Sequence, residues 1–211
     1  MTERRGLFLT FEGPDGSGKS TQMRLLAQKL AAMGYRVVET VEPGGTRIGE
    51  QIRRILLEPE HREMCARTEL LLYFAARAQN VEERIEPALR EGRIVLSDRY
   101  TDSTMAYQGF ARALGPEVVE QLHRIACRGL QPHLTLCYDI DVETGLARAR
   151  RRGMNRMDDQ ALEFHRRVRE AYQEIARREP RVRLIDGAPP VEKVFEATWA
   201  AVEPLLAGAQ H

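Results

Sequence analysis

Short apolar runs recur along the chain, separated by longer stretches in which apolar residues follow the helical period. The runs predict buried strands at Leu7–Glu12, Arg36–Val41, Ile94–Ser97, Leu134–Tyr138 and Val182–Ile185. The stretches between them predict helices at Lys19–Met33, Ile48–Leu57, Thr68–Arg90, Glu117–Arg128, Val142–Arg152, Asp159–Arg178 and Val191–Leu206. Because strands that are apolar throughout alternate with helices, the pattern predicts an α/β fold with a parallel sheet flanked by helices on both faces.

The length and composition of the chain are typical of one globular domain. Its 211 residues are 43% hydrophobic and 30% charged, a balance that disordered and collagen-like chains lack. No Pro- or Gly-rich linker divides the sequence. We therefore expect a single domain over residues 1–211.

Charge and cysteine content narrow the class of protein. The 32 basic and 31 acidic side chains leave a formal net charge of +1, which argues against a surface built throughout to bind nucleic acid. The apolar run after the charged start is too short for a signal segment or a membrane span, so no membrane partner is expected. Cys65, Cys127 and Cys137 have no CxxC spacing and no nearby His pair, which is typical of reduced thiols. These features predict a cytoplasmic protein.

The strongest motif follows the first predicted strand. Residues 13–20 read Gly-Pro-Asp-Gly-Ser-Gly-Lys-Ser, the pattern G-x-x-x-x-G-K-[ST] of a P-loop. Its backbone N–H groups and the helix start surround a phosphate, Lys19 reaches the β- and γ-phosphates, and the Ser20 hydroxyl can bind Mg²⁺. The expected nucleotide-binding residues are Gly13, Pro14, Asp15, Gly16, Ser17, Gly18, Lys19, Ser20 and Thr21.

The rest of the chain indicates how the nucleotide is used. There is no Asn-Lys-x-Asp motif, which weakens a GTPase interpretation, and none of the long extensions typical of mechanical ATPases. Asp98-Arg99-Tyr100 follows a buried strand and therefore lies at the carboxyl edge of the sheet, where open α/β folds bind ligands. An arginine there can hold a phosphate with its planar fork. This pattern favours a kinase that acts on a small phosphorylated acceptor.

Several segments in order resemble the bacterial type of the thymidylate kinase family. They are Phe11–Thr21, Glu42–Thr46, Gly49-Glu50, Ile52-Arg53, Ala75–Arg77, Asp98–Tyr100, Ser103, Ala106–Gly109 and Leu146–Arg150. The resemblance implies a P-loop NTPase fold of the nucleoside monophosphate kinase kind, and phosphorylation of dTMP to dTDP with ATP and Mg²⁺. It also implies a homodimer. A kinase for another nucleoside monophosphate or small phosphorylated acceptor, and a nucleotide-binding module without catalysis, remain the alternatives.

The resemblance implies roles for residues at the phosphates. Arg99 would hold the acceptor phosphate. Asp98 would support the Mg²⁺–phosphate assembly through water, together with Ser20. Asp15, a carboxylate inside an anion-binding loop, would contact a sugar hydroxyl or an arginine.

A second group of residues falls at family positions for the acceptor nucleotide. Tyr73 stands where the family has a Phe that stacks on thymine, with Phe74 beside it, so either ring can be the stacking one. The other expected substrate-binding residues are Arg53 near the phosphate, Arg77, Thr104 and Gln108 at the base, and Tyr107 at the 2′ side of the sugar. Val41 stands where bacterial members usually have an Arg, so one positive charge is missing.

An arginine-rich segment at about residues 148–158 is expected to form a small lid. Such a charge run is most often a solvated helix face, but phosphoryl transfer needs cations around the γ-phosphate. Gly16 occupies the position where some family members carry a catalytic Arg in the P-loop, which points to the lid as the source of that charge. From the run we assign Arg150 and Arg156, and the predicted catalytic residues are Asp15, Lys19, Arg99, Arg150 and Arg156.

Overall fold

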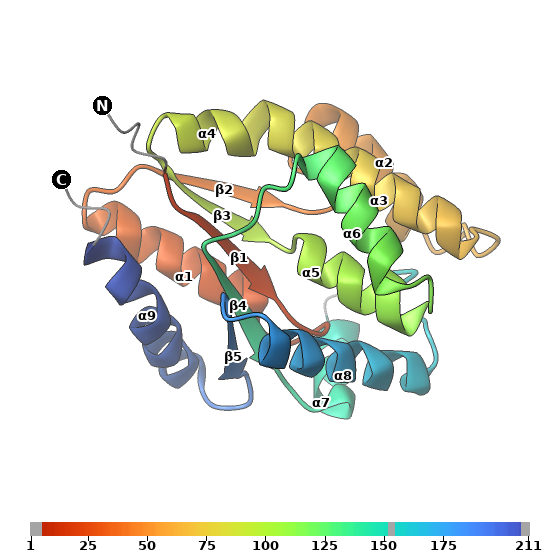
Figure 1. Cartoon of the computed structure of the whole chain (residues 1–211). Helices are drawn as coiled ribbons and strands as arrows, with labels where there is room; N and C mark the ends of the chain where they lie inside the picture. Colours follow the sequence, from red (N-terminus) through yellow and green to blue (C-terminus); the bar gives the residue numbers. More distant parts are fainter. Residues whose placement is uncertain (1–5, 152–154, 208–211) are drawn as a thin grey trace.

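A computed structural model describes residues 6–151 and 155–207 of the chain. The strands are β1 (Phe8–Glu12), β2 (Val37–Val41), β3 (Ile94–Asp98), β4 (Leu134–Asp139) and β5 (Val182–Asp186). All pair in parallel, in the order β2-β3-β1-β4-β5 (Figure 1). The predicted strands and the parallel sheet are confirmed, with ends that differ by a residue or two.

Helices fill the connections between the strands, as predicted. They are α1 (Lys19–Ala32), α2 (Arg47–Leu57), α3 (Ala66–Asn80), α4 (Glu86–Arg90), α5 (Thr101–Thr104), α6 (Pro116–Cys127), α7 (Val142–Arg151), α8 (Leu162–Arg178) and α9 (Val191–Ala207). Two π-helical segments join neighbours: η1 (Val81–Ile85) links α3 to α4, and η2 (Met105–Ala111) continues α5. The expected long helix from Thr68 to Arg90 is therefore one helical stretch with a wider turn in its second half.

Each face of the sheet has its own apolar core. On one face, β-strand residues such as Leu9 and Leu96 pack against Leu26 of α1 and Val202 of α9. On the other, Phe8 and Val95 pack against helices α3, η1, α4 and α6, and α8 covers the β4 and β5 part (Figure 1). Burial on both faces explains why every central strand reads as a continuous apolar run.

The helix formed by α5 and η2 was not expected from the sequence. Its first turn, Thr101–Thr104, is buried yet consists of polar residues, so it carries no apolar stripe from which a helix could be read. Residues expected at the acceptor site, Thr104, Tyr107 and Gln108, all lie on this helix.

The topology places a crevice between β1 and β3. From β1 the chain crosses to β2 at one edge, whereas from β3 it crosses β1 to reach β4. Loops that leave the carboxyl ends of β1 and β3 therefore diverge and leave room for a ligand. The P-loop and the Asp98–Tyr100 turn are these two loops.

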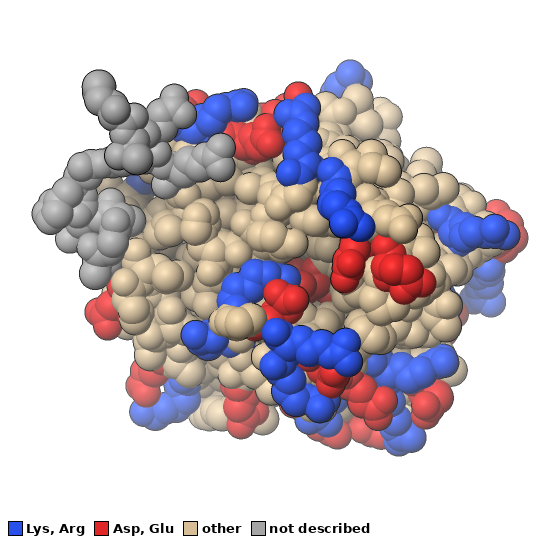
Figure 2. Space-filling model, viewed as in Figure 1, with Lys and Arg blue, Asp and Glu red and all other residues tan. Residues whose placement is uncertain are grey.

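The surface is mixed in charge. Basic and acidic side chains lie interspersed over the face shown in Figure 2, in keeping with the near-zero net charge. Within residues 6–151 and 155–207, no helix has the length and apolar character needed to cross a membrane.

Candidate active site

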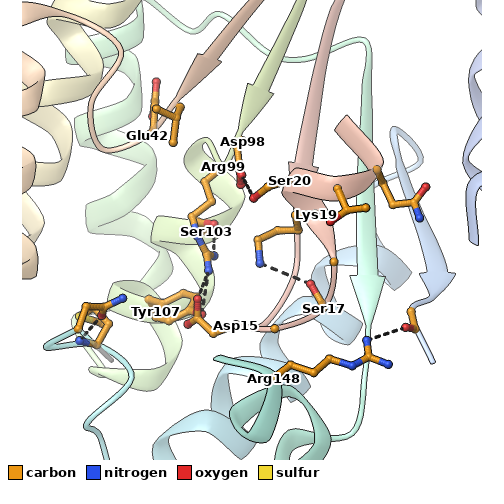
Figure 3. Close-up of a pocket in the computed structure, with 18 of the residues that line it drawn as sticks. Asp15, Ser17, Lys19, Ser20, Glu42, Asp98, Arg99, Ser103, Tyr107 and Arg148 are labelled. Atoms are coloured by element: carbon orange, nitrogen blue, oxygen red, sulfur yellow. Dashed lines mark hydrogen bonds and ion pairs between the residues drawn. The ribbon is translucent and has the colours of Figure 1, made fainter. Parts of the chain in front are cut away.

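A cavity of about 1080 Å³ opens at the carboxyl edge of the sheet. The P-loop, the turn after β3, helix α3, helix α5–η2 and the start of α9 contribute to its walls (Figure 3). Of the predicted site residues, it gathers Asp15, Gly16, Ser17, Gly18, Lys19, Ser20, Thr21, Arg53, Tyr73, Arg77, Asp98, Arg99, Thr104, Tyr107 and Gln108. Residues from five separate parts of the chain thus meet at one site.

The P-loop wraps around the side chain of its own lysine. The Lys19 ammonium group donates to the carbonyl oxygens of Gly13 and Pro14 at 3.0 and 2.7 Å, and lies 3.4 Å from the Ser17 hydroxyl. Gly18 has φ of +94° and precedes the first residue of α1, a conformation that glycine adopts without strain. The start of α1 therefore faces the cavity, with its N–H groups and positive dipole end available to an anion.

Helix α7 closes off one side of the loop. A Cβ on Gly16 would lie 2.0 Å from the carbonyl oxygen of Gly145 in α7. No side chain fits there unless α7 moves away, so the P-loop of this chain cannot carry an arginine at position 16 in this packing. Position 16 of the P-loop therefore contributes no side-chain cation beside Lys19.

Ser20 and Asp98 meet at the junction of the two motifs. The Ser20 hydroxyl donates to Oδ2 of Asp98 in a short hydrogen bond (Figure 3). A hydroxyl and a carboxylate side by side are hard oxygen ligands of the kind that Mg²⁺ takes, usually one or two from protein with the rest from phosphate and water. No cluster of three or more His, Cys, Asp or Glu side chains suited to a metal occurs among the described residues, which fits such a sparse site. The residues present therefore fit the predicted metal.

Arg99 joins the P-loop to helix α5–η2. Its Nη2 donates to Oδ1 of Asp15 at 2.8 Å, and its Nη1 donates to the hydroxyls of Ser103 and Tyr172 at 2.9 and 3.1 Å. The Tyr107 hydroxyl donates to the other oxygen of Asp15 at 2.7 Å (Figure 3). Of the two partners expected for Asp15, a sugar hydroxyl or an arginine, the structure has the arginine.

The backbone at Arg99 is strained. Its φ of +73° lies in the left-handed region, which is uncommon for residues other than glycine. Such strain persists only where surrounding contacts hold it, and it concentrates at functional sites.

A buried glutamate that the sequence did not reveal, Glu12, supplies those contacts. Its Oε1 accepts the backbone N–H of Tyr100 at 2.6 Å, and its Oε2 accepts the hydroxyls of Ser103 at 2.5 Å and Tyr172 at 3.3 Å. Burial raises the pKa of Glu12 to about 8, with a further contribution from the charge of Asp102. Glu12 thus holds both the backbone after Arg99 and the hydroxyls that bind its guanidinium group.

The structure distinguishes the two rings proposed for base stacking. Tyr73 lines the cavity, whereas Phe74 is 3% exposed and packs in the core with Leu70 and Val81. Neighbouring residues on a helix point about 100° apart, so only one of them can face the site. Arg53 also lines the cavity, and its Nη1 donates to the carbonyl oxygen of Pro43 at 2.6 Å.

Arg77 lines the cavity although it is only 1% exposed. Its Nε lies 2.5 Å from Oε2 of Glu42, and its Nη2 donates to the Tyr100 carbonyl and the Thr104 hydroxyl at 3.1 and 2.9 Å. Asn80 donates to the other oxygen of Glu42 at 2.9 Å. Nη1 of Arg77 is buried without a hydrogen-bond partner among the described residues, so one donor of a cavity-lining arginine is left for a ligand.

The lid segment expected at about residues 148–158 is described only in part. Residues 152–154, and with them Arg152, lie outside the described residues. Arg148 lines the cavity and donates to the carbonyl oxygen of Gly187 at 3.2 Å, and Arg150 is exposed on α7. Arg156 is 5% exposed and lies 2.7 Å from Glu69 of α3 instead of beside the P-loop.

One wall of the cavity was not found from the sequence. The loop between β5 and α9, Gly187–Pro190, and the first residue of α9, Val191, border it near the P-loop. These residues are small or apolar and match no motif, so only the fold reveals them. Gln22 of α1 donates to the Val191 carbonyl at 3.0 Å and fixes the loop against the P-loop helix.

Comparisons with known proteins agree with this geometry. The family model described as thymidylate kinase matches residues 11–198. A thymidylate kinase from Pelobacter propionicus is 51% identical over 205 residues, covering 93% of this chain and 94% of that protein. A thymidylate kinase from Geobacillus sp. (strain WCH70) is 48% identical over 208 residues, covering 97% of this chain and 99% of that protein. The crystal structure of thymidylate kinase from Ehrlichia chaffeensis superimposes with a TM-score of 0.77 at 31% identity, over 94% of this chain and 99% of that one.

Proposed function

Because this chain belongs to the thymidylate kinase family, we propose that it transfers the γ-phosphoryl group of ATP to dTMP, giving ADP and dTDP. The observation that carries the proposal is the single cavity in which a P-loop faces an arginine–aspartate pair and a set of polar groups suited to a pyrimidine. Donor and acceptor phosphates can meet between Lys19 and Arg99, without water in between once the site is filled.

The donor binds at the P-loop side. The triphosphate lies along the N–H groups of residues 13–20, with Lys19 turned to the β- and γ-phosphates. Arg148 and the Gly187–Pro190 loop line the same side of the cavity and offer a flat, partly apolar surface for the base. This places the γ-phosphate toward Asp15 and Arg99.

The acceptor binds across from it. Arg99 and Arg53 are the cations at this side, and a planar guanidinium group can grip the acceptor phosphate with two N–H groups. Tyr107 and Asp15 border the sugar, where the ring of Tyr107 leaves little room for a 2′ hydroxyl. Tyr73 stacks on the base, while Nη1 of Arg77 and the amide of Gln108 offer it hydrogen bonds.

The transfer step needs no general base. An oxygen of the acceptor phosphate is already ionised, so it attacks the γ-phosphorus as the bond to the β-phosphate oxygen breaks, and ADP leaves with that electron pair. Catalysis then consists of positioning and of cations that meet charge on the γ-phosphoryl group. Lys19 and Arg99 supply these from either side.

Mg²⁺ is proposed to bind with the donor at Ser20 and Asp98, the latter through water. When bound, it neutralises part of the phosphate charge. The short Ser20–Asp98 hydrogen bond keeps both oxygens together at the cavity, which supports this assignment.

From the lid we assign Arg150 as a cation for the transition state. It lies on the exposed face of α7, the helix that packs against the P-loop at Gly16. For Arg156 to act there as well, its guanidinium group has to leave Glu69 when the lid closes. A closed lid also keeps water from the γ-phosphate.

Membership of the family also suggests an oligomeric state and a cellular location. We propose a homodimer, supported by exposed apolar side chains on the neighbouring helices α2, α3 and α6, namely Ile48, Ile55, Leu71 and Ile125. Light scattering during gel filtration would measure its mass. A cytoplasmic location is supported by the free thiols of Cys65, Cys127 and Cys137.

The test is an assay of ADP release, coupled to NADH oxidation, with dTMP, dUMP, dCMP, dGMP and dAMP as acceptors. We expect Mg²⁺-dependent turnover with dTMP at the highest kcat/KM. Preference for another monophosphate would replace the substrate assignment. Nucleotide binding without ADP release for any acceptor would contradict the kinase assignment itself.

A further inference from the structure

Glu69 of α3 lies at the centre of a polar cluster and has no role of its own in the reaction described so far. Its carboxylate is 1% exposed. Oε1 accepts from Nε2 of Gln108 at 2.8 Å and from Nε of Arg112 at 3.3 Å. Oε2 lies 3.3 Å from Nη2 of Arg112 and 2.7 Å from Nη2 of Arg156. We call these four residues the Glu69 cluster.

Glu69 is ionised in this cluster. Burial alone would raise its pKa, but the hydrogen bond from Gln108 and the charges of Arg112 and Arg156 outweigh burial and lower it. An ionised carboxylate accepts hydrogen bonds and donates none. Any group that hydrogen-bonds to it must therefore present a donor.

This fixes the orientation of the Gln108 amide. A glutamine amide has a donor end, Nε2, and an acceptor end, Oε1, and either can in principle face a neighbour. Here Nε2 must face Glu69, and a flipped amide would set its oxygen against a buried carboxylate. Gln108 is itself 1% exposed, yet it lines the cavity. Oε1 is then the end of the amide that a ligand can use.

An acceptor at this position discriminates between pyrimidines. Thymine and uracil carry an N–H donor at N3, whereas cytosine has a lone pair there and an amino group at C4. Oε1 of Gln108 can accept from the first two and meets like polarity in the third. We propose that Glu69 is a specificity-determining positioning residue, which orients Gln108 so that the site selects acceptors with an N3–H. This inference rests on the proposed function, since it needs a pyrimidine monophosphate as the acceptor.

Arg112 and Arg156 support this role of Glu69. Nη1 of Arg112 donates to Gln160 at 2.9 Å, and Nε of Arg156 donates to the Leu56 carbonyl at 2.8 Å, so both guanidinium groups are fixed from their far sides. They hold the Glu69 carboxylate in place as well as keeping it charged. Arg156, in the expected lid segment, is thereby linked through Glu69 to Gln108.

The test compares Glu69→Gln with the wild type on dTMP, dCMP and dUMP at saturating ATP. An amide at position 69 can donate or accept, so both orientations of Gln108 become possible. We expect the ratio of kcat/KM for dTMP to that for dCMP to fall by about tenfold or more, because a site with fixed polarity rejects a mismatched group strongly. The ratio for dTMP to dUMP should stay within about twofold, because both bases have an N3–H. A purely structural role would disturb packing at the 5-methyl group and move that second ratio too.

Two further variants complete the test. Glu69→Asp keeps the charge beside Arg112 and Arg156 but withdraws it from Gln108. It should therefore lower the same dTMP/dCMP ratio. It replaces Glu69→Gln in the test if that variant does not fold. In a Gln108→Leu background, Glu69→Gln should change that ratio by less than about twofold, since the two act as one unit. A wild type that uses dCMP as well as dTMP, or Glu69 variants that retain the wild-type ratio, would overturn the inference while dTMP kinase activity stands. A wild type that does not phosphorylate dTMP would overturn the proposed function instead.

Discussion

Two arginines that the sequence assigns to catalysis, Arg99 and Arg156, both end beside a carboxylate but in different surroundings. The Arg99–Asp15 pair lies at the cavity, with side chains 18% and 11% exposed. The Arg156–Glu69 pair is nearly sealed, at 5% and 1%. A ligand can reach the first pair directly. Separating the second pair leaves the buried Arg156 guanidinium group without its counter-charge, at a cost of about 3–5 kcal/mol. An arginine in a phosphate-binding enzyme therefore has to be judged by its partner and its exposure, and not by its place in a charge run.

The largest effect is expected for Lys19→Ala, in the cavity that also contains the Arg99–Asp15 pair. The loop loses its cation for the β- and γ-phosphates, so kcat should fall by about 10³-fold or more. Circular dichroism and thermal unfolding should remain close to wild type, because the ammonium group donates to carbonyl oxygens of its own loop and not to the apolar core. Wild-type turnover in a folded Lys19→Ala protein would contradict the kinase assignment.

The second prediction separates the lid arginines. Arg150→Ala should lower kcat by about 10²-fold or more while the dissociation constants of both nucleotides change little, as expected for a cation that meets charge only during transfer. Arg156→Ala should act mainly on KM for dTMP and on the choice of base, through Glu69. Single-turnover rates and both dissociation constants would be measured for each variant and for the double variant.

Two outcomes would change this assignment. A kcat loss in Arg156→Ala as large as that in Arg150→Ala would show that Arg156 exchanges Glu69 for the γ-phosphate when the lid closes. If the kcat of the double variant stayed within about threefold of wild type, the arginine run would have no catalytic role. It would then be a solvated helix face, where exposed charges contribute little.

The third prediction concerns Arg99 and its contact with the acceptor phosphate. Arg99→Ala should lower kcat/KM for dTMP by about 10- to 150-fold, the equivalent of about 1.5–3 kcal/mol for a lost charged hydrogen-bond partner. The dissociation constant of ATP should change less than about twofold, since the P-loop is intact. Arg99→Lys is the matched control and should recover part of the loss. If ATP binding weakened and dTMP binding did not, Arg99 would belong to the donor phosphates.

The sequence was sufficient where function depends on contiguous residues. The strands and the P-loop are local patterns, and the parallel order of β1 and β3 brings the two loops together by topology alone. Asp15 and Arg99 were therefore both predicted at the site, although the arginine that would contact Asp15 was not identified. Tyr73 and Phe74 could not be separated, because α3 is buried against the core on one side and faces the cavity on another.

What the sequence did not reveal are single glutamates whose partners come from distant segments. Glu12 and Glu69 each pair with donors far along the chain, and the sequence alone gave neither residue a role. Helix α5–η2 was missed for a related reason. Its polar side chains are buried because they hydrogen-bond to such groups, as Ser103 does to Glu12, so hydrophobic periodicity could not indicate it.

The smallest expected effect concerns the support behind the Asp98–Tyr100 turn, where His123 contacts the ring of Tyr100 and lies 2.9 Å from the Thr101 hydroxyl. Burial lowers the pKa of His123 to about 4, assisted by the charges of Arg77 and Arg181 and opposed by Asp102. The unfolded chain binds this proton near pH 6.5, so the stabilisation is complete above that pH and is lost as the pH falls from 6.5 toward 4.

With allowance for solvent screening, the change should be about 1–2 kcal/mol in the free energy of unfolding. Urea unfolding of the wild type and of His123→Gln between pH 7.5 and 4.5 measures it, and the difference between the two proteins cancels the groups they share. That difference should shrink steadily as the pH falls below 6.5, because only the wild type has to suppress protonation at this position. A difference that stays constant over the whole range would mean that His123 titrates normally.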